Sequence, residues 1–210
     1  MLDLYFAPTP NGWKITILLE ELQLPYQIRS AKSAKSEPYD EEFLAISPNH
    51  RIPILVDPKG PDHYPLTLFE SGAIMIWLAE KQKKFLPATG SQRYRTLQWL
   101  FWQIGGQTNH FAHETPDDHQ HALEHYSTEF EQLLAAMERD LDHSEWLAGD
   151  YSIADMSCFP WVLLYQKFGK KLSTFPQLSI WFERMKERPG VQAGVNASAN
   201  QSDRHQAIDD

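Results

Sequence analysis

The sequence predicts a small α/β domain followed by an all-α domain, and two patterns support this. Over residues 1–82, short apolar strands alternate with amphipathic helices in the order βαβ and then ββα, which is typical of a small mixed sheet covered by helices. Over residues 92–195 the pattern is helical throughout. Residues 83–91, a polar stretch that holds proline and glycine, are predicted to be a linker, and residues 196–210 a polar tail.

The composition limits the classes of function. The 210 residues carry a formal net charge of −9, which argues against binding to a nucleic-acid backbone. A single cysteine, Cys158, excludes an internal disulfide framework and fits a reducing cytosol. The first residues show no signal-peptide pattern, and no apolar stretch approaches the roughly 18 residues that span a bilayer. We therefore expect a cytoplasmic protein that binds neither nucleic acid nor membrane.

The first domain divides into elements by its hydrophobic periodicity. Apolar residues recur on one face of each of its two long predicted helices: Ile15, Leu18, Leu19 and Leu22 in the first, and Ala73, Ile74, Trp77 and Leu78 in the second. Turn residues between two apolar runs predict a hairpin. The expected elements are strands at 2–6, 25–32, 51–57 and 66–69, helices at 12–22 and 70–82, and a short helix or loop at 37–47.

The second domain is predicted to hold helices at 93–106, 121–142, 152–169 and 175–188. Ser152 and Asp155 have the spacing of a capping box before an apolar run, which indicates a helix start and not a catalytic pair. Cys158 lies in an apolar helix, so we expect a buried, inert thiol. The apolar run Trp99–Trp102 fits protein core, dimer surface or pocket wall.

The first strand of the chain runs into a turn that holds no residue of the usual catalytic types. The stretch "YFAPTPNGWKITILLEEL" offers only Thr9 and Asn11 between the strand and the helix. In one interpretation these side chains serve a ligand at the start of the helix. In the other, Asn11 only caps the helix at Gly12.

A second segment, "SPNHRIPILVD", carries Pro53 at a predicted strand. Proline cannot donate to a strand ladder, so Pro53 belongs at an edge or at a cis bond. The backbone of Ile52 could then pair with a bound peptide. The alternative is a simple kink at the edge of the sheet.

A third segment, "LFESGAI", places Glu70 and Ser71 where a strand ends and a helix begins. Unpaired N–H groups and partial positive charge at a helix N-terminus suit a carboxylate. The side chain of Glu70 suits an ammonium group, and a ligand with both groups is an amino acid. The alternative is that Ser71 is a plain cap beside an acidic residue.

Together, these segments resemble the glutathione transferase family, and in particular its bacterial nu-class branch, the glutathione-dependent disulfide-bond oxidoreductases. The similar stretches are "LYFAPTPNG.KIT", "EFLAISPN..IP", "LFESGAI", "LQWLFWQIGG" and "WLAGDYSIADMSCFPWV", which span nearly the whole chain. The glutathione transferase-like domain of a fungal nitrogen-regulatory prion protein is a more distant relative.

The resemblance implies an N-terminal thioredoxin-like domain, a C-terminal helical bundle and a cytosolic homodimer that binds glutathione or glutathione disulfide. Most relatives outside this branch activate the glutathione thiol with a Tyr, Ser or Cys of the protein. In this branch Thr9 and Asn11 occupy that turn, so the resemblance implies that they stabilise the thiolate of the ligand. The glutathione contacts carried over by position are Ile52 beside Pro53 for the cysteinyl backbone, Glu70 and Ser71 for the γ-glutamyl end, and Arg51 for the glycine carboxylate.

The expected activity is glutathione-dependent reduction of small-molecule disulfides without a protein cysteine. Conjugation of glutathione to electrophiles is the enzymatic alternative, and a non-catalytic glutathione-binding regulatory protein is the alternative from another class. The chain departs from its relatives at Pro38, where they often carry Gln, and after Gly106, where the segment is shorter. Five histidines between 110 and 125 lack a known zinc-ligand spacing, so we expect no metal site.

Overall fold

The computed structural model describes residues 1–30, 41–48, 51–107 and 119–197. The chain forms two compact units. One contains Met1–Gln82 together with the described residues from Glu187 onward, and the other contains Lys83–Lys186. In the described part of the chain, every helix is too short or too polar to cross a membrane.

The first unit is built on a four-stranded mixed sheet with the strand order β2-β1-β3-β4. Its strands are β1 (Leu2–Phe6), β2 (Tyr26–Ser30), β3 (Ile54–Asp57) and β4 (Leu66–Leu68). The β1 and β2 strands are parallel, whereas β1 with β3 and β3 with β4 are antiparallel. This arrangement confirms the predicted βαβ-ββα order, including the hairpin, whose connection holds the short 3-10 helix η2 (Pro61–His63).

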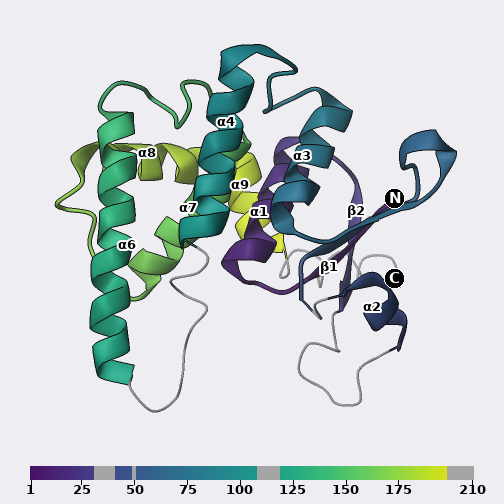
Figure 1. The fold of residues 1–210 in the computed structure, drawn as a ribbon, viewed down its shortest axis with the longest axis horizontal. Coiled ribbons are helices and arrows are strands. Elements are labelled where there is room, and N and C mark those ends of the chain that lie inside the picture. The colour runs from purple at the N-terminus through teal and green to yellow at the C-terminus, as the bar shows by residue number, and fades with distance from the viewer. Residues whose placement is uncertain (31–40, 49–50, 108–118, 198–210) are drawn as a thin grey trace, which may run out of the picture. The chain divides into compact units, whose positions relative to one another are not determined.

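Helices cover both faces of this sheet. Leu2, Leu4 and Phe6 of β1 are buried, while Tyr5 points to the opposite face and its ring contacts Phe43 of α2 (Glu41–Ile46), with 6.0 Å between the ring centroids. The helices α1 (Pro10–Glu21) and α3 (Ser71–Gln82) pack against each other on the other face (Figure 1).

The α1 helix is buried almost all round because a second helix, α9 (Pro189–Val195), packs against it from the far end of the chain. The hydroxyl of Thr16 donates to the carbonyl of Gly194 at 2.7 Å. A Cβ atom on Gly194 would lie 2.5 Å from the Ile17 backbone, so only glycine allows this approach. The sequence predicted one helix at 175–188 and grouped everything to residue 195 with the second domain. The structure instead has two helices, α8 (Pro176–Glu187) and α9, with α9 in the first unit.

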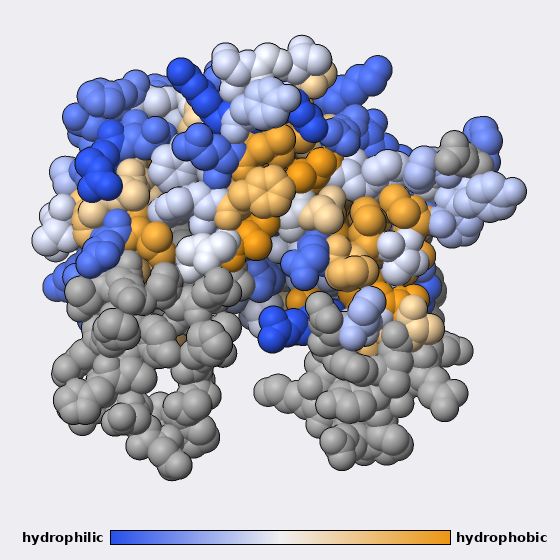
Figure 2. Space-filling view, viewed as in Figure 1, coloured by the Kyte–Doolittle hydropathy of each residue, from blue (hydrophilic) through white to orange (hydrophobic). Residues whose placement is uncertain are grey.

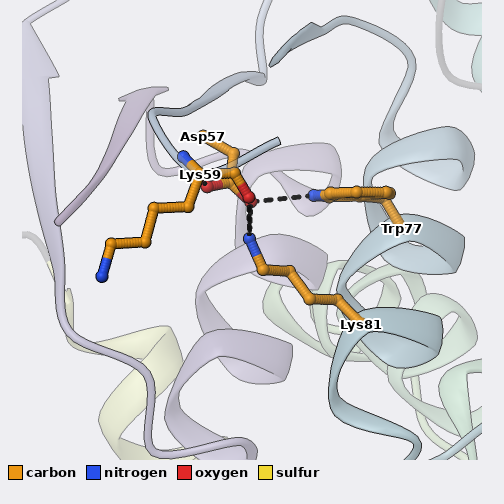
Figure 3. Close-up of polar contacts among 4 residues, drawn as sticks. All are labelled: Asp57, Lys59, Trp77 and Lys81. Atoms are coloured by element: carbon orange, nitrogen blue, oxygen red, sulfur yellow. Dashed lines mark hydrogen bonds and ion pairs between the residues drawn. The ribbon is translucent and has the colours of Figure 1, made fainter. Parts of the chain in front are cut away.

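A buried carboxylate fastens α3 to the end of β3. Asp57 accepts hydrogen bonds from Trp77 Nε1 at 3.1 Å, from the ammonium group of Lys81, and from the backbone N–H of Lys59 at 2.9 Å (Figure 3). Burial raises the pKa of Asp57, but these donors outweigh burial and hold it below its usual value. Trp77 is only half-buried and Ala73 is exposed, although both were predicted on the apolar face of this helix. The buried face of α3 uses Met75 and Ala79 with Ile74 and Leu78.

The second unit is helical in its described residues, as predicted. It contains α4 (Gly90–Trp102), the π-helical segment η3 (Gln103–Gln107), α6 (His119–Leu141), α7 (Ile153–Lys167) and most of α8. Its core is formed by large apolar side chains, among them Leu100, Phe130, Leu134, Met137, Phe159, Val162, Trp181 and Phe182.

The predicted capping box at the start of α7 is confirmed. Ser152 is the N-cap, its hydroxyl accepts from the N–H of Ala154, and the Asp155 carboxylate accepts from the N–H of Ser152 at 3.0 Å. Asp155 is fully buried and also accepts from Trp181 Nε1 and from the N–H of Leu147, both at 2.9 Å. It thereby links α7 to α8 and to the turn before α7.

The aromatic run on α4 divides between core and surface. Leu100 is fully buried, Phe101 is 60% exposed, and the rings of Trp99 and Trp102 meet edge to face at 4.9 Å. Figure 2 shows hydrophobic side chains gathered over α4 on the face that is drawn. Leu100 therefore belongs to the core, whereas Phe101 is available for contact with another molecule.

Candidate functional site

The end of β1, the start of β3 and the end of β4 lie at one edge of the four-stranded sheet. Tyr5, near the end of β1, pairs with Ile54, the first residue of β3. Leu55 in turn pairs with Leu68, the last residue of β4. The turn after β1, the residues before β3 and the residues after β4 therefore lie at the same edge.

The predicted site residues come from these three segments. Thr9 and Asn11 follow β1, Arg51, Ile52 and Pro53 precede β3, and Glu70 and Ser71 follow β4. The topology thus gathers segments that are distant in sequence. Pro38 and two histidines of the predicted cluster, His110 and His113, lie outside the described residues.

Thr9 is the N-cap of α1. Its backbone is extended and its hydroxyl accepts from the N–H of Gly12 at 3.3 Å. The interpretation that Asn11 caps the helix is therefore wrong, because α1 begins at Pro10 and Asn11 lies in its first turn. A Cβ atom on Gly12 would lie 2.2 Å from the carbonyl oxygen of Ala7, so glycine is required where the helix meets this turn.

A buried lysine joins the segment after β1 to the segment after β4. Lys14 is 0% exposed, and its ammonium group donates to Oδ1 of Asn11 at 2.8 Å and to the hydroxyl of Ser71 at 3.5 Å. Lys14 was not among the predicted site residues, because a lysine in an amphipathic helix normally lies on the solvent face. The available signal was its position inside a run of apolar residues, three after Asn11.

The start of α3 provides a second helix N-terminus at this edge. Ser71 is the first residue of α3 and is 8% exposed, so it does not cap the helix from outside. Glu70 precedes it in a left-handed conformation, with φ of 68°, and its carbonyl accepts from the N–H of Ile74 at 3.0 Å. A non-glycine residue in this conformation is uncommon and often marks a functional turn. The Glu70 side chain is exposed.

The segment before β3 is fixed through its backbone. The hydroxyl of Ser47 accepts from the N–H of Arg51 and donates to its carbonyl, both at 3.0 Å. The Ile52–Pro53 peptide bond is cis, one of the two possibilities predicted for this proline. Ile52 is partly exposed and lies outside the ladder of β3, and the Arg51 side chain is exposed.

Neither a metal centre nor a protein thiol contributes to this edge in the described residues. No group of three or more His, Cys, Asp or Glu in the described part of the chain is arranged to hold a metal ion. Cys158 is fully buried in α7, as predicted, with the hydroxyl of Ser157 3.9 Å from its sulfur.

Comparison with known protein families identifies both parts of the chain. Residues 9–81 match the family described as "Glutathione S-transferase, N-terminal domain", and residues 80–189 match "Glutathione S-transferase, C-terminal domain". The chain belongs to the glutathione S-transferase family. The resemblance read from its motifs is therefore confirmed, as is the thioredoxin-like α/β fold of its first domain and the helical fold of its second.

Two curated relatives of this glutathione transferase are enzymes of Escherichia coli strain K12. The disulfide-bond oxidoreductase YfcG is 45% identical over 199 residues, which cover 91% of this chain and 93% of that protein. The disulfide-bond oxidoreductase YghU is 32% identical over 99% of this chain and 81% of that protein.

Solved structures of related transferases contain glutathione. A glutathione transferase from Burkholderia graminis, with two glutathione molecules bound per subunit, superimposes with a TM-score of 0.85 and 36% identity, covering 93% of this chain and 87% of that one. A glutathione transferase from Pseudomonas putida, with one glutathione disulfide bound per subunit, gives a TM-score of 0.81 and 38% identity, covering 92% and 90%.

Proposed function

We propose that this glutathione transferase binds glutathione at the sheet edge described above and uses it to reduce disulfide bonds. One observation carries the proposal: the N-termini of α1 and α3 converge on the buried ammonium group of Lys14. Two helix N-termini and a cation form a site suited to an anionic peptide. The names of YfcG and YghU as disulfide-bond oxidoreductases support the reaction type.

The two ends of the ligand are assigned by charge. The N–H groups at the start of α3 and the hydroxyl of Ser71 suit the γ-glutamyl carboxylate, and the exposed Glu70 carboxylate suits its ammonium group. The backbone of Ile52, which lies outside the ladder of β3, pairs with the cysteinyl residue of the ligand. Arg51 is the proposed partner of the glycine carboxylate, with its backbone fixed by Ser47.

The reacting atom is the sulfur of the ligand, which this arrangement brings to Thr9 and Asn11. A free thiol has a pKa of about 8.5, so only about 3% is thiolate at pH 7. A hydroxyl, an amide N–H and the N-terminus of α1 each favour the thiolate. Lowering the thiol pKa by one unit requires only about 1.4 kcal/mol, which is within reach of one charge-assisted hydrogen bond.

The reaction is a pair of thiol–disulfide exchanges. The glutathione thiolate attacks one sulfur of the substrate disulfide, a new S–S bond forms, and the other sulfur leaves as a thiolate that takes up a proton. A second glutathione thiolate then attacks the glutathione sulfur of this mixed disulfide and releases the second substrate thiol. Two glutathione molecules supply the two electrons and leave as glutathione disulfide. Since the single cysteine, Cys158, is buried in the second unit, no protein thiol takes part in the proposed steps.

The finer identity of the protein is part of the same proposal. We place it in the nu-class branch, as a cytoplasmic homodimer that acts on small-molecule disulfides. The exposed Phe101 and its apolar surroundings on α4 support an interface with a second copy. Sedimentation analysis at micromolar concentration tests the dimer directly.

A turnover assay with glutathione and bis(2-hydroxyethyl) disulfide, coupled to glutathione reductase and NADPH, tests the reaction. We expect enzymatic turnover by the wild type, and by Cys158→Ala at a similar rate. A loss of 100-fold or more in folded Cys158→Ala would contradict the ligand-thiol mechanism. Turnover with an electrophile such as 1-chloro-2,4-dinitrobenzene, but not with the disulfide, would identify a conjugating transferase. Binding of glutathione without either activity would identify a regulatory protein.

A further inference from the structure

We infer that Lys14 is a positioning residue of the proposed thiolate site: its ammonium group orients Asn11 and Ser71 as hydrogen-bond donors to the ligand and adds positive charge behind them. This inference rests on the proposed function. Lysine side chains are almost never fully buried unless they are paired, and Lys14, which is 0% exposed in the second turn of α1, is paired with Asn11 and Ser71. Its burial therefore needs a reason beyond the folding of an amphipathic helix.

The contact with Asn11 fixes which way its amide faces. An ammonium group has three N–H donors and no acceptor, so the amide atom that faces Lys14 at 2.8 Å must be the oxygen. The NH₂ group of Asn11 then points away from Lys14. Asn11 lies partly exposed in the first turn of α1, so this NH₂ group can serve the ligand as a donor, where an acceptor would repel a thiolate.

The contact with Ser71 also makes the side chain available as a donor to the ligand. Its hydroxyl oxygen faces the ammonium group at 3.5 Å and so accepts from it, which turns the hydroxyl proton elsewhere. Ser71 stands at the N-terminus of α3, where the neighbouring N–H groups are also donors. One cation thus gives the side chains of Asn11 and Ser71, which lie in segments distant in sequence, the same donor polarity.

The positive charge acts on the ligand through these donors. Because Lys14 is buried, its charge is screened by water far less than that of a surface lysine. A cation behind the donors lowers the pKa of a nearby thiol, as it does for reactive protein cysteines. In this account Lys14 does not touch the reacting sulfur, and it acts through Asn11 and through its charge.

The test compares Lys14→Met with a matched control in the same helix. Methionine keeps an unbranched side chain of similar length but has neither charge nor N–H donors. Thr16→Val is the control, because Thr16 is also fully buried and polar but bonds to Gly194 in α9. The bound thiol pKa is followed by the ultraviolet absorbance of the thiolate, and turnover is measured from pH 6 to pH 9.5.

In Lys14→Met we expect the bound thiol pKa to rise by about one to two units and turnover at pH 7 to fall about 10- to 100-fold, in line with the loss of thiolate. The deficit should shrink as pH rises toward 9.5, because the thiol then ionises without help. Affinity for S-methylglutathione, which has no thiol to ionise, should fall less than turnover does, since the contacts from Ile52 and Glu70 remain. Thr16→Val should lose stability without any shift of the bound thiol pKa.

Two results would overturn the role of Lys14 alone: a bound thiol pKa in Lys14→Met equal to that of an active wild type, or a loss of turnover that is the same at every pH. A wild type that binds neither glutathione nor S-methylglutathione contradicts the proposed function itself, and the role of Lys14 with it. Should Lys14→Met not fold, Lys14→Gln replaces it. Glutamine keeps an N–H donor for Asn11 but carries no charge, so the same alkaline shift is expected in smaller measure.

Discussion

Arg188 and Glu21 form a two-point ion pair, with Nε to Oε1 and Nη2 to Oε2 both at 2.8 Å. Glu21 is the last residue of α1, and Arg188 is the N-cap residue of α9. The Glu21 side chain is 7% exposed and that of Arg188 is 30% exposed. A parallel pair of charge-assisted bonds in this setting is stronger and more directional than a surface ion pair.

Replacing Arg188 by alanine should lower the free energy of unfolding by about 2 kcal/mol, because it leaves the buried Glu21 carboxylate without its guanidinium partner. Urea unfolding at neutral pH measures this change. Lys186→Ala is the control, since Lys186 pairs with Glu183 on the surface, where the two side chains are 48% and 59% exposed. That change should cost less than about 1 kcal/mol. Equal effects of the two substitutions would show that the Arg188–Glu21 pair adds no more than a surface pair.

Glu70→Ala should weaken glutathione binding roughly 10-fold or more, because it removes the proposed partner of the γ-glutamyl ammonium group, a contact worth about 1.5–3 kcal/mol. Isothermal calorimetry measures the affinity. Glu80→Ala, an exposed acid on the same helix, should leave the affinity unchanged. Unchanged affinity in Glu70→Ala would mean that the segment only starts the helix.

Removing both Thr9 and Asn11 side chains should affect turnover more than binding. Loss of one stabilising donor costs about 1–3 kcal/mol, so turnover should fall roughly 10- to 100-fold per side chain, and the bound thiol pKa should rise toward its free value. Normal turnover with an unshifted thiol pKa in the folded Thr9→Ala, Asn11→Ala double variant would leave activation to backbone N–H groups alone.

The thermal stability of the Thr9 variants must be measured beside their kinetics, because Thr9 caps α1. Thr9→Ala should cost about 1 kcal/mol of stability through the lost cap. Thr9→Ser keeps a hydroxyl in the same position and should keep both the cap and most of the turnover. This variant shows whether the effects of Thr9→Ala come from the lost hydroxyl or from the lost methyl group.

Asp155 should make the stability of the protein depend on pH. Burial raises the pKa of Asp155 to about 7, although N–H groups of Trp181, Leu147 and Ser152 act in the opposite direction. Because the folded pKa lies above the unfolded value of 3.8, the folded state holds this proton more tightly. Stability from this residue is therefore complete at acidic pH and falls as pH rises from about 4 to about 7.

Between pH 5 and pH 7 this titration should lower the free energy of unfolding by about 2 kcal/mol, at about 1.4 kcal/mol for each pKa unit. Urea unfolding at both pH values measures the difference, which should be absent in Asp155→Asn. That variant should also be less stable than the wild type at pH 5, since an amide matches these donors less well. Asp150→Asn, which changes an exposed acid, should keep the wild-type pH dependence.

Much of the fold could be predicted because local pattern and global structure agree. The strands β1 and β3 are buried apolar runs beside clear turn signals, so their order and the hairpin after β3 followed from the hydrophobic pattern together with the turn residues. The capping box of Ser152 and Asp155 could also be predicted, because it depends only on residues close together in the sequence. The place of α9 in the first unit could not be predicted, since it depends on packing against α1.

The candidate site was predictable as three segments but not as an arrangement. Motif and resemblance selected Thr9, Glu70 and their neighbours, and the register of the sheet brought those segments to one edge. The residue that caps α1 was not predicted correctly. Thr9 is the N-cap, where Asn11 was the candidate, because α1 begins two residues earlier than the periodicity indicated. Lys14 was missed because burial of a charge depends on tertiary neighbours that no window of sequence contains.

The packing of α9 on α1 has a consequence for how the protein is made. A ribosome that has finished residues 1–82 has made every strand of the sheet but not the segment that covers Thr16 and Ile17, since Gly194 is still more than a hundred residues from synthesis. The first unit is therefore completed last, after the chain of the second unit has emerged. The apolar face of α1 that α9 covers stays exposed for the whole of that interval, and a nascent chain cut short before residue 187 leaves that face uncovered.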